Sequence, residues 1–109
     1  MKRIAASLTP ALALAILLLA LPTLTPAQAD KTYKANCALC HGPDGSGSTP
    51  SGKALKAQDL RSDAVLKKSD ADLTASITAG KGKMPAFGKK LKPEDIQQLV
   101  AFIRALPKK

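Results

Sequence analysis

The 109-residue sequence is poor in the residues that fill large cores and build catalytic centres. It contains no tryptophan, one tyrosine, two phenylalanines, one histidine and two cysteines. So few large side chains bury only a small core, and two cysteines three residues apart close too short a loop to stabilise it. We therefore expect a bound group to complete the core.

The same scarcity excludes several classes of protein. Two cysteines and one histidine are too few ligands for a structural zinc site, which needs four. Scarce aromatic residues and arginines argue against nucleic acid as the partner of a basic chain. The sequence contains no acid–base pair that would indicate an enzyme or a small-molecule substrate. Strand patterns are essentially absent. These absences predict an all-α protein without catalytic residues.

The first 29 residues have the order of a secretory signal peptide. Lys2 and Arg3 precede an apolar run over residues 4–21, and Ala27-Gln28-Ala29 forms an A-x-A cleavage site. The run approaches the length of a membrane span, but Pro10 interrupts it. We expect cleavage after Ala29, without lasting membrane insertion.

Cleavage there leaves a mature domain of residues 30–109 in the periplasm. Removing Lys2 and Arg3 from the 17 basic residues leaves 15 against 8 acidic ones, a net charge of +7. A two-cysteine chain exported in this way suits a covalently attached cofactor.

Three segments predict helices. The first covers residues 30–41 and ends at a loop over residues 42–53, for which Leu55 and Leu60 are the expected apolar anchors. The second begins after the capping residue Ser69 and stops at Gly80. The third opens at Pro93 with two acids and then carries apolar residues at helical spacing, namely Ile96, Leu99, Val100, Ile103 and Leu106.

The chemistry lies in Cys37-Ala38-Leu39-Cys40-His41, the C-x-x-C-H signature of c-type haem attachment. On a helix, positions i and i+3 project to one side, so both thiols reach the vinyl-derived carbons of one porphyrin. The residue at i+4 then places its imidazole over the ring centre. A thiol–disulfide oxidoreductase is the alternative, but it would need a βαβ context.

Two candidate iron ligands follow from the composition. His41 is the only histidine, and Met84 is the only methionine besides Met1. A His/Met pair gives low-spin iron suited to electron transfer. Core filling is the other reading of a lone methionine, but Met84 lies in a Gly/Lys loop beside Pro85. A haem protein with an open sixth position, such as a gas sensor or peroxidase, stays open as a second reading.

These residues together resemble the class I c-type cytochromes, the small monohaem bacterial type. The resemblance covers nearly all of residues 30–109 and rests on CALCHG, the GPDGSG loop, the segment around Met84-Pro85-x-Phe87 and the closing helix PEDIQQLVAFIRAL. It implies a cytochrome c fold of three to five helices around one covalent haem c, with His41 and Met84 as axial ligands. It also implies that the N- and C-terminal helices cross.

The resemblance further implies supporting roles. Tyr33 and Phe102 would pack near the helix crossing, and Phe87 would line the haem pocket. A proline carbonyl, that of Pro50 or else Pro43, would accept the N–H of His41. Propionate contacts stay open, since the tryptophan that many relatives use is missing.

Lysines cluster around Met84, at Lys81, Lys83, Lys89, Lys90 and Lys92. If Met84 ligates the iron, this loop lies near the haem edge, and its charge would steer the protein onto acidic docking surfaces. We therefore predict a periplasmic electron carrier whose partners are redox proteins with acidic surfaces, either diffusing freely or as a subunit of a larger complex.

Overall fold

The computed structural model describes residues 26–108, which contain helices and no β-strand. The helices are α1 (Pro26–Asn36), α2 (Ala38–His41), α3 (Pro50–Leu55), α4 (Asp63–Leu66), α5 (Asp70–Ala79) and α6 (Pro93–Arg104). Only one residue separates α1 from α2, so these two can be counted as one bent helix. The number of helices then agrees with the expected three to five. Residues 1–25, most of the predicted signal segment, lie outside the described part.

The first helix differs from its predicted bounds at both ends. It begins at Pro26 rather than at residue 30, and it is interrupted at Cys37 before α2 continues to His41. The side chain of Asn36 donates to the carbonyl of Thr32 at 2.9 Å. Such a bond offers the carbonyl a partner besides the backbone ladder, and it lies directly before the break.

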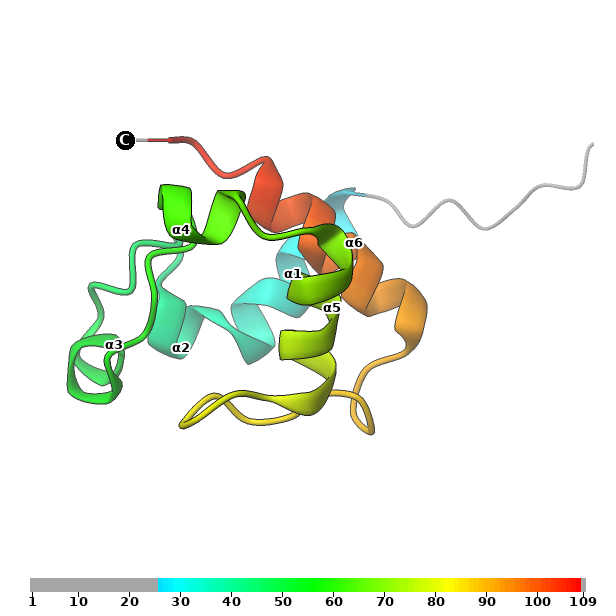
Figure 1. Cartoon of the computed structure of the whole chain (residues 1–109), viewed down its shortest axis with the longest axis horizontal. Helices are drawn as coiled ribbons and strands as arrows, with labels where there is room; N and C mark the ends of the chain where they lie inside the picture. Colours follow the sequence, from blue (N-terminus) through cyan, green and yellow to red (C-terminus); the bar gives the residue numbers. More distant parts are fainter. Residues whose placement is uncertain (1–25, 109) are drawn as a thin grey trace, which may run out of the picture.

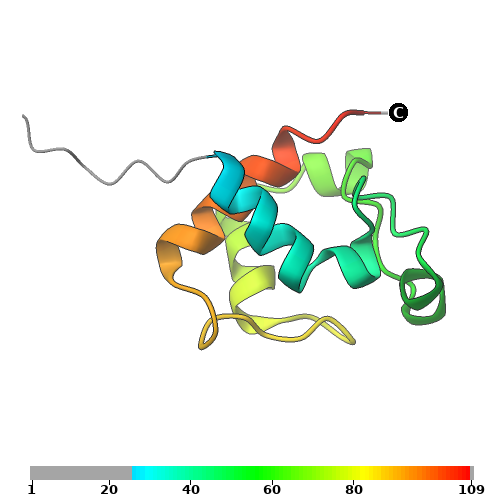
Figure 2. The ribbon, with the colours of Figure 1, turned by 180° about the vertical axis from the view of Figure 1, so that it is seen from behind.

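The core lies where α1 crosses α6, as both views of the ribbon show (Figures 1 and 2). Tyr33, only 1% exposed, packs on Phe102 with ring centroids 4.7 Å apart. The predicted apolar positions of α6 are all buried, as are Leu73 and Ile77 of α5. The expected crossing of the terminal helices is confirmed, and Tyr33 packs on Phe102 across the two helices.

Helix α5 begins and ends where its capping residues predict, and α6 begins at Pro93 as predicted but ends at Arg104, two residues before the predicted run ends. Ser69 accepts a hydrogen bond from the N–H of Asp72 at the start of α5, and Gly80, with φ of 74°, ends that helix. At α6, Pro93 occupies the first turn and the carboxylate of Asp95 accepts the N–H of Lys92 at 3.2 Å.

Two short helices, α3 and α4, were not predicted. The expected loop over residues 42–53 is wrong at its end, because α3 starts at Pro50 with Thr49 as its N-cap. A threonine followed by proline is a recognisable helix start. Leu60 is buried as expected of an anchor, but Leu55 is not. It ends α3 at the wall of the large cavity and is 42% exposed, so it is not the buried anchor that was predicted.

Nothing within residues 26–108 is both long and apolar enough to serve as a membrane-spanning helix.

Tyr33 should titrate abnormally. It is the only tyrosine, so phenolate absorbance reports it alone. Burial, with a smaller contribution from the negative charge of Asp44, raises its pKa above the ordinary value of about 10. The folded state keeps the proton at pH values where the unfolded chain releases it, so stability is lost as the pH rises above about 10.

A spectrophotometric titration of the folded and the urea-unfolded protein measures this difference, with Tyr33→Phe as the blank. The same midpoint in both states would show that the phenol is not buried as described.

Candidate functional site

One large cavity lies between α1–α2, the α3–α4 region, α5 and the loop after it. Its volume is about 450 Å³. Its wall contains four of the predicted site residues with chemical functions, Cys37, Cys40, His41 and Met84, together with Tyr33 and Phe87. The rest of the wall is largely apolar, with Leu60, Val65, Ile77, Leu99 and Ile103. The fold thus brings the sequence-predicted ligands around a single space.

Both cysteines reach this cavity because the helical path of α1 continues into α2, which places the two residues on the same side. The N–H of Cys37 still bonds to the carbonyl of Tyr33 at 2.8 Å, and that of His41 to the carbonyl of Cys37 at 2.9 Å. The helical turn therefore continues through the motif despite the break. Burial raises the pKa of the Cys37 thiol to about 11, so this sulfur is a neutral thiol before any bond to a cofactor.

The imidazole of His41 is oriented by a backbone carbonyl. Its Nδ1 lies 3.0 Å from the oxygen of Gln58. A carbonyl oxygen only accepts hydrogen bonds, so Nδ1 carries the proton and Nε2 keeps its lone pair for a metal. In the neutral ring, this is the tautomer that leaves Nε2 available to a metal.

The predicted proline acceptor is therefore wrong. Pro50 occupies the first turn of α3 and Pro43 lies two residues after His41, whereas the carbonyl that the His41 ring contacts is that of Gln58. The Gln58 acceptor is a main-chain atom, so its side chain left no signature in the sequence. Only the path of the chain after α3 reveals it.

Met84 is held by a tight turn. Its N–H and carbonyl pair with the carbonyl and N–H of Lys81, at 3.0 and 3.1 Å. Further along, Phe87 and Gly88 donate to the carbonyls of Ile77 and Thr78 at the end of α5, both at 3.0 Å. The loop, yellow beneath α5 in Figure 1, is thereby tied at both ends with Met84 on the cavity wall.

Thr49 joins α3 to the motif. Its hydroxyl donates to the carbonyl of Leu39 at 2.6 Å, lies 3.2 Å from that of Cys40, and accepts the N–H of Gly52 at 2.9 Å. At Gly52 the two segments approach so closely that a Cβ would overlap the carbonyl of Cys40. The sequence analysis did not single out either residue, although both position the second cysteine.

The ionisable side chains on the cavity wall, apart from Tyr33 and the candidate ligands, are all lysines, namely Lys56, Lys68, Lys81 and Lys83. No carboxylate is among the wall residues. Lys81 and Lys83 were predicted for this region, whereas Lys89 and Lys90 do not line the cavity, and Lys56 and Lys68 were missed. Neither Phe102, which packs behind Tyr33, nor Pro50 lines it.

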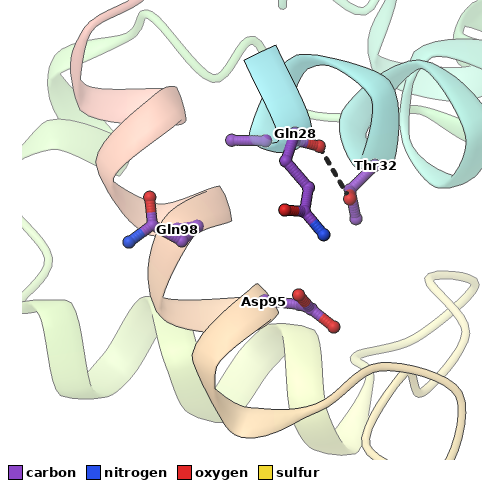
Figure 3. Close-up of a pocket in the computed structure, with 5 residues that line it drawn as sticks. Gln28, Thr32, Asp95 and Gln98 are labelled. Carbon is purple, nitrogen blue, oxygen red and sulfur yellow. Dashed lines mark hydrogen bonds between the residues drawn. The ribbon is translucent and has the colours of Figure 1, made fainter. Parts of the chain in front are cut away.

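A second hollow lies between the first turn of α1 and α6, where Gln28, Thr32, Asp95 and Gln98 gather (Figure 3). The hydroxyl of Thr32 donates to the carbonyl of Gln28 at 2.9 Å. This hollow has no room even for a water molecule, so it carries no site.

The large cavity fits a haem. Its wall is mainly apolar, two thiols stand three residues apart, and an imidazole whose Nδ1 is already hydrogen-bonded has Nε2 available. The thioether of Met84 is on the same wall. These residues would bond the porphyrin through Cys37 and Cys40 and could ligate its iron.

Comparisons with known proteins show which family the chain resembles. The family model described as "Cytochrome C oxidase, cbb3-type, subunit III" matches residues 25–103. Cytochrome c6 of Gloeothece citriformis is 35% identical over 99 residues, which cover 83% of this chain and 84% of that protein.

Two solved structures are also similar. The KustC0563 c-type cytochrome has a TM-score of 0.67 and 34% identity, with 74% of this chain and 98% of that chain covered. The c-type cytochrome XoxG from Methylobacterium extorquens AM1 has a TM-score of 0.59 and 30% identity, with 73% of this chain and 48% of that chain covered.

The Thr49 contacts predict a specific effect of Thr49→Val. The variant leaves the carbonyl of Leu39 and the N–H of Gly52 without their partner, so the free energy of unfolding should fall by about 1–2 kcal/mol. Guanidinium unfolding of the haem-loaded protein measures this. The visible circular dichroism of the haem should change as well, because the segment bearing Cys40 is no longer held.

Ser69→Ala is the matched control, since it removes the equivalent cap of α5. It should cost about 1 kcal/mol and leave the haem signals unchanged. If the haem signals of Thr49→Val are also those of the unaltered protein, Thr49 does not position the motif.

Proposed function

The chain belongs to the class I c-type cytochromes, which hold haem c through thioether bonds, and on that premise we propose that it carries single electrons with His41 and Met84 as axial ligands. The observation that carries the proposal is the convergence of both ligand side chains and both thiols on one largely apolar cavity. A haem bound there supplies an iron that alternates between Fe(III) and Fe(II).

The chain's own residues define what this iron does. The Nδ1–H of His41 bonded to Gln58 increases the basicity of the ligating nitrogen and prevents the ring from rotating. The paired hydrogen bonds of Lys81 and Met84 hold the second ligand in place. Two such ligands leave no position for a substrate, which supports a carrier rather than an enzyme.

An open-site haem protein is the alternative function. It would need Met84 to stay away from the iron and a distal group to act on peroxide or gas. The only histidine is the proposed axial ligand, and both mature arginines are engaged elsewhere, Arg61 with Asp59 and Arg104 with Asp70. Rapid binding of carbon monoxide by the reduced protein would favour this alternative.

Export to the periplasm, with cleavage after Ala29, remains part of the proposal. Cleavage there would remove the first turn of α1, including the buried side chain of Ala29. Helix α1 would then begin at Asp30, whose carboxylate suits a helix N-terminus and already pairs with Lys34 at 2.9 Å. N-terminal sequencing of the exported protein would identify the cleavage site.

The partners are proposed to be redox proteins with acidic docking surfaces. Lys81 and Lys83 lie at the cavity, and Lys89 and Lys90 extend the basic region along the same loop. Such a surface accelerates encounter with negatively charged partners, and the effect falls with salt.

Met84→Ala tests the ligand set. The oxidised protein should lose the weak sulfur-to-iron absorption band, because no other thioether is available. Its reduction potential should fall by on the order of 0.1 V, since a methionine ligand stabilises Fe(II). Absorption spectroscopy and a redox titration measure the two effects.

The control is Pro85→Ala, which changes the neighbouring exposed residue and keeps the sulfur. It should retain the band. An unchanged band and potential in Met84→Ala would refute His/Met ligation while leaving haem attachment intact.

A lysine is expected to replace Met84 in alkaline solution. Lys81 and Lys83 both line the cavity within three residues of Met84, so either amine is close enough once it has lost its proton. A pH titration of the sulfur-to-iron band in Lys81→Ala and Lys83→Ala should show the band persisting to higher pH in the variant that lacks the replacing lysine.

Lys90→Ala provides the comparison, because Lys90 does not line the cavity. If the three variants and the unaltered protein lose the band at one pH, neither lysine is the incoming ligand.

A further inference from the structure

We propose that Arg104 is a positioning residue, which keeps the haem cavity closed by holding the α4–α5 junction against α6. The junction is the stretch of residues 66–70, from the last residue of α4 to the first of α5. Arg104 itself does not line the cavity. The inference rests on the proposed electron-carrier function and deepens it, because it assigns control of access to the iron to a residue outside the haem site.

The guanidinium of Arg104 extends from the end of α6 to acceptors in the junction. Its Nη2 donates to the carbonyl of Lys68 at 2.6 Å, its Nη1 to the carbonyl of Leu66 at 3.3 Å, and its Nε to the carboxylate of Asp70 at 2.5 Å. A lysine ammonium, which is a point charge without this planar fork, cannot reproduce the arrangement. Since the acceptors on Leu66 and Lys68 are main-chain atoms, the contacts fix the backbone of the junction.

Helix α4 depends on such contacts for its position. It is four residues long, and among the described helices it makes no extensive contact with another. A helix of this length is not stable by itself, and its last carbonyls lack partners within the helix. The side chain of Ser62 caps its start, and the burial of Val65 fixes one side. Arg104 supplies a donor to the carbonyl of Leu66 at its end.

The contacts of Arg104 join two adjoining walls of the cavity. Val65 and Lys68 line the cavity from the side of α4 and the junction, whereas Leu99 and Ile103 line it from α6. Ile103 directly precedes Arg104 in the chain, and the carbonyl of Lys68 accepts from the guanidinium. The distance between these walls therefore depends on whether Arg104 holds the junction.

A closed wall affects the iron in two ways. It keeps water away from the haem, and a less hydrated site favours Fe(II) over the more highly charged Fe(III). It also keeps small external ligands from reaching the iron. Electron exchange does not require the wall to open, because one electron is gained or lost and no bond or proton is exchanged. Arg104 would thus protect the carrier without taking part in the transfer.

Imidazole binding to the oxidised, haem-loaded protein measures access to the iron, since imidazole must enter the cavity and displace the sixth ligand. Arg104→Lys is the main variant, because it keeps the positive charge and cannot bond all the acceptors. Arg104→Gln removes the charge as well. Asp70→Asn removes the ion pair and leaves both carbonyl contacts. Ala101→Gly, on the exposed side of α6, is the matched control, because it weakens the helix and leaves Arg104 intact.

Both Arg104 variants should bind imidazole about tenfold more tightly than the unaltered protein, because the lost hydrogen bonds raise the population of the open wall. Their reduction potentials should fall in a redox titration, since the haem becomes more hydrated. Asp70, whose side chain is 74% exposed, contributes little through its ion pair, so Asp70→Asn should behave as the unaltered protein. Ala101→Gly should do the same. Amide hydrogen exchange over residues 63–70 should accelerate in the Arg104 variants alone.

An imidazole affinity and a potential that do not change in Arg104→Lys, together with faster exchange, would show that Arg104 supports the fold without controlling the cavity. Unchanged exchange would show that it does not hold the junction. Equally tight imidazole binding by Ala101→Gly would attribute the effect to a general loss of stability. Each of these results overturns the inference. A protein without a reversible one-electron wave would instead overturn the proposed function, and the exchange rates would still decide whether Arg104 holds the junction.

Discussion

The hydrogen bond from His41 Nδ1 to the carbonyl of Gln58 is the interaction on which the chemistry of this site depends. It settles which ring nitrogen carries the proton, and so leaves Nε2 as a ligand. Without it the ring could rotate and present its N–H to the cavity. Because the acceptor belongs to the segment after α3, the orientation of the His41 ring depends on the correct folding of that segment.

The surroundings of the motif show how a chain with few aromatic residues achieves this order. Tyr33 packs on Phe102 and donates to the carbonyl of Gly42 at 2.7 Å, so one side chain connects α1, α6 and the residue after His41. From the other side, Thr49 holds the carbonyls of Leu39 and Cys40. The attachment segment is therefore supported by two hydroxyl groups, which supply in hydrogen bonds what the small core lacks in packing.

The cavity wall combines apolar side chains with lysines. Among the described residues the wall contains lysines and no carboxylate, so the field at the cavity is positive. Leu39 and Leu55, which are exposed, line the same cavity. The lysines and the apolar side chains therefore surround one space.

Short-range features of the sequence determined the helical class, the attachment motif, the two candidate ligands, the caps of α5 and α6 and the buried stripe of α6, because spacing along a helix fixes which side chains share a face. Only the tertiary structure decided that Gln58 rather than a proline accepts from His41, that Leu55 is exposed, and which lysines reach the cavity. Those outcomes depend on main-chain atoms and on the route of residues 42–66 around the site. Main-chain acceptors are identical at every residue, so the sequence does not indicate which of them a distant side chain will contact.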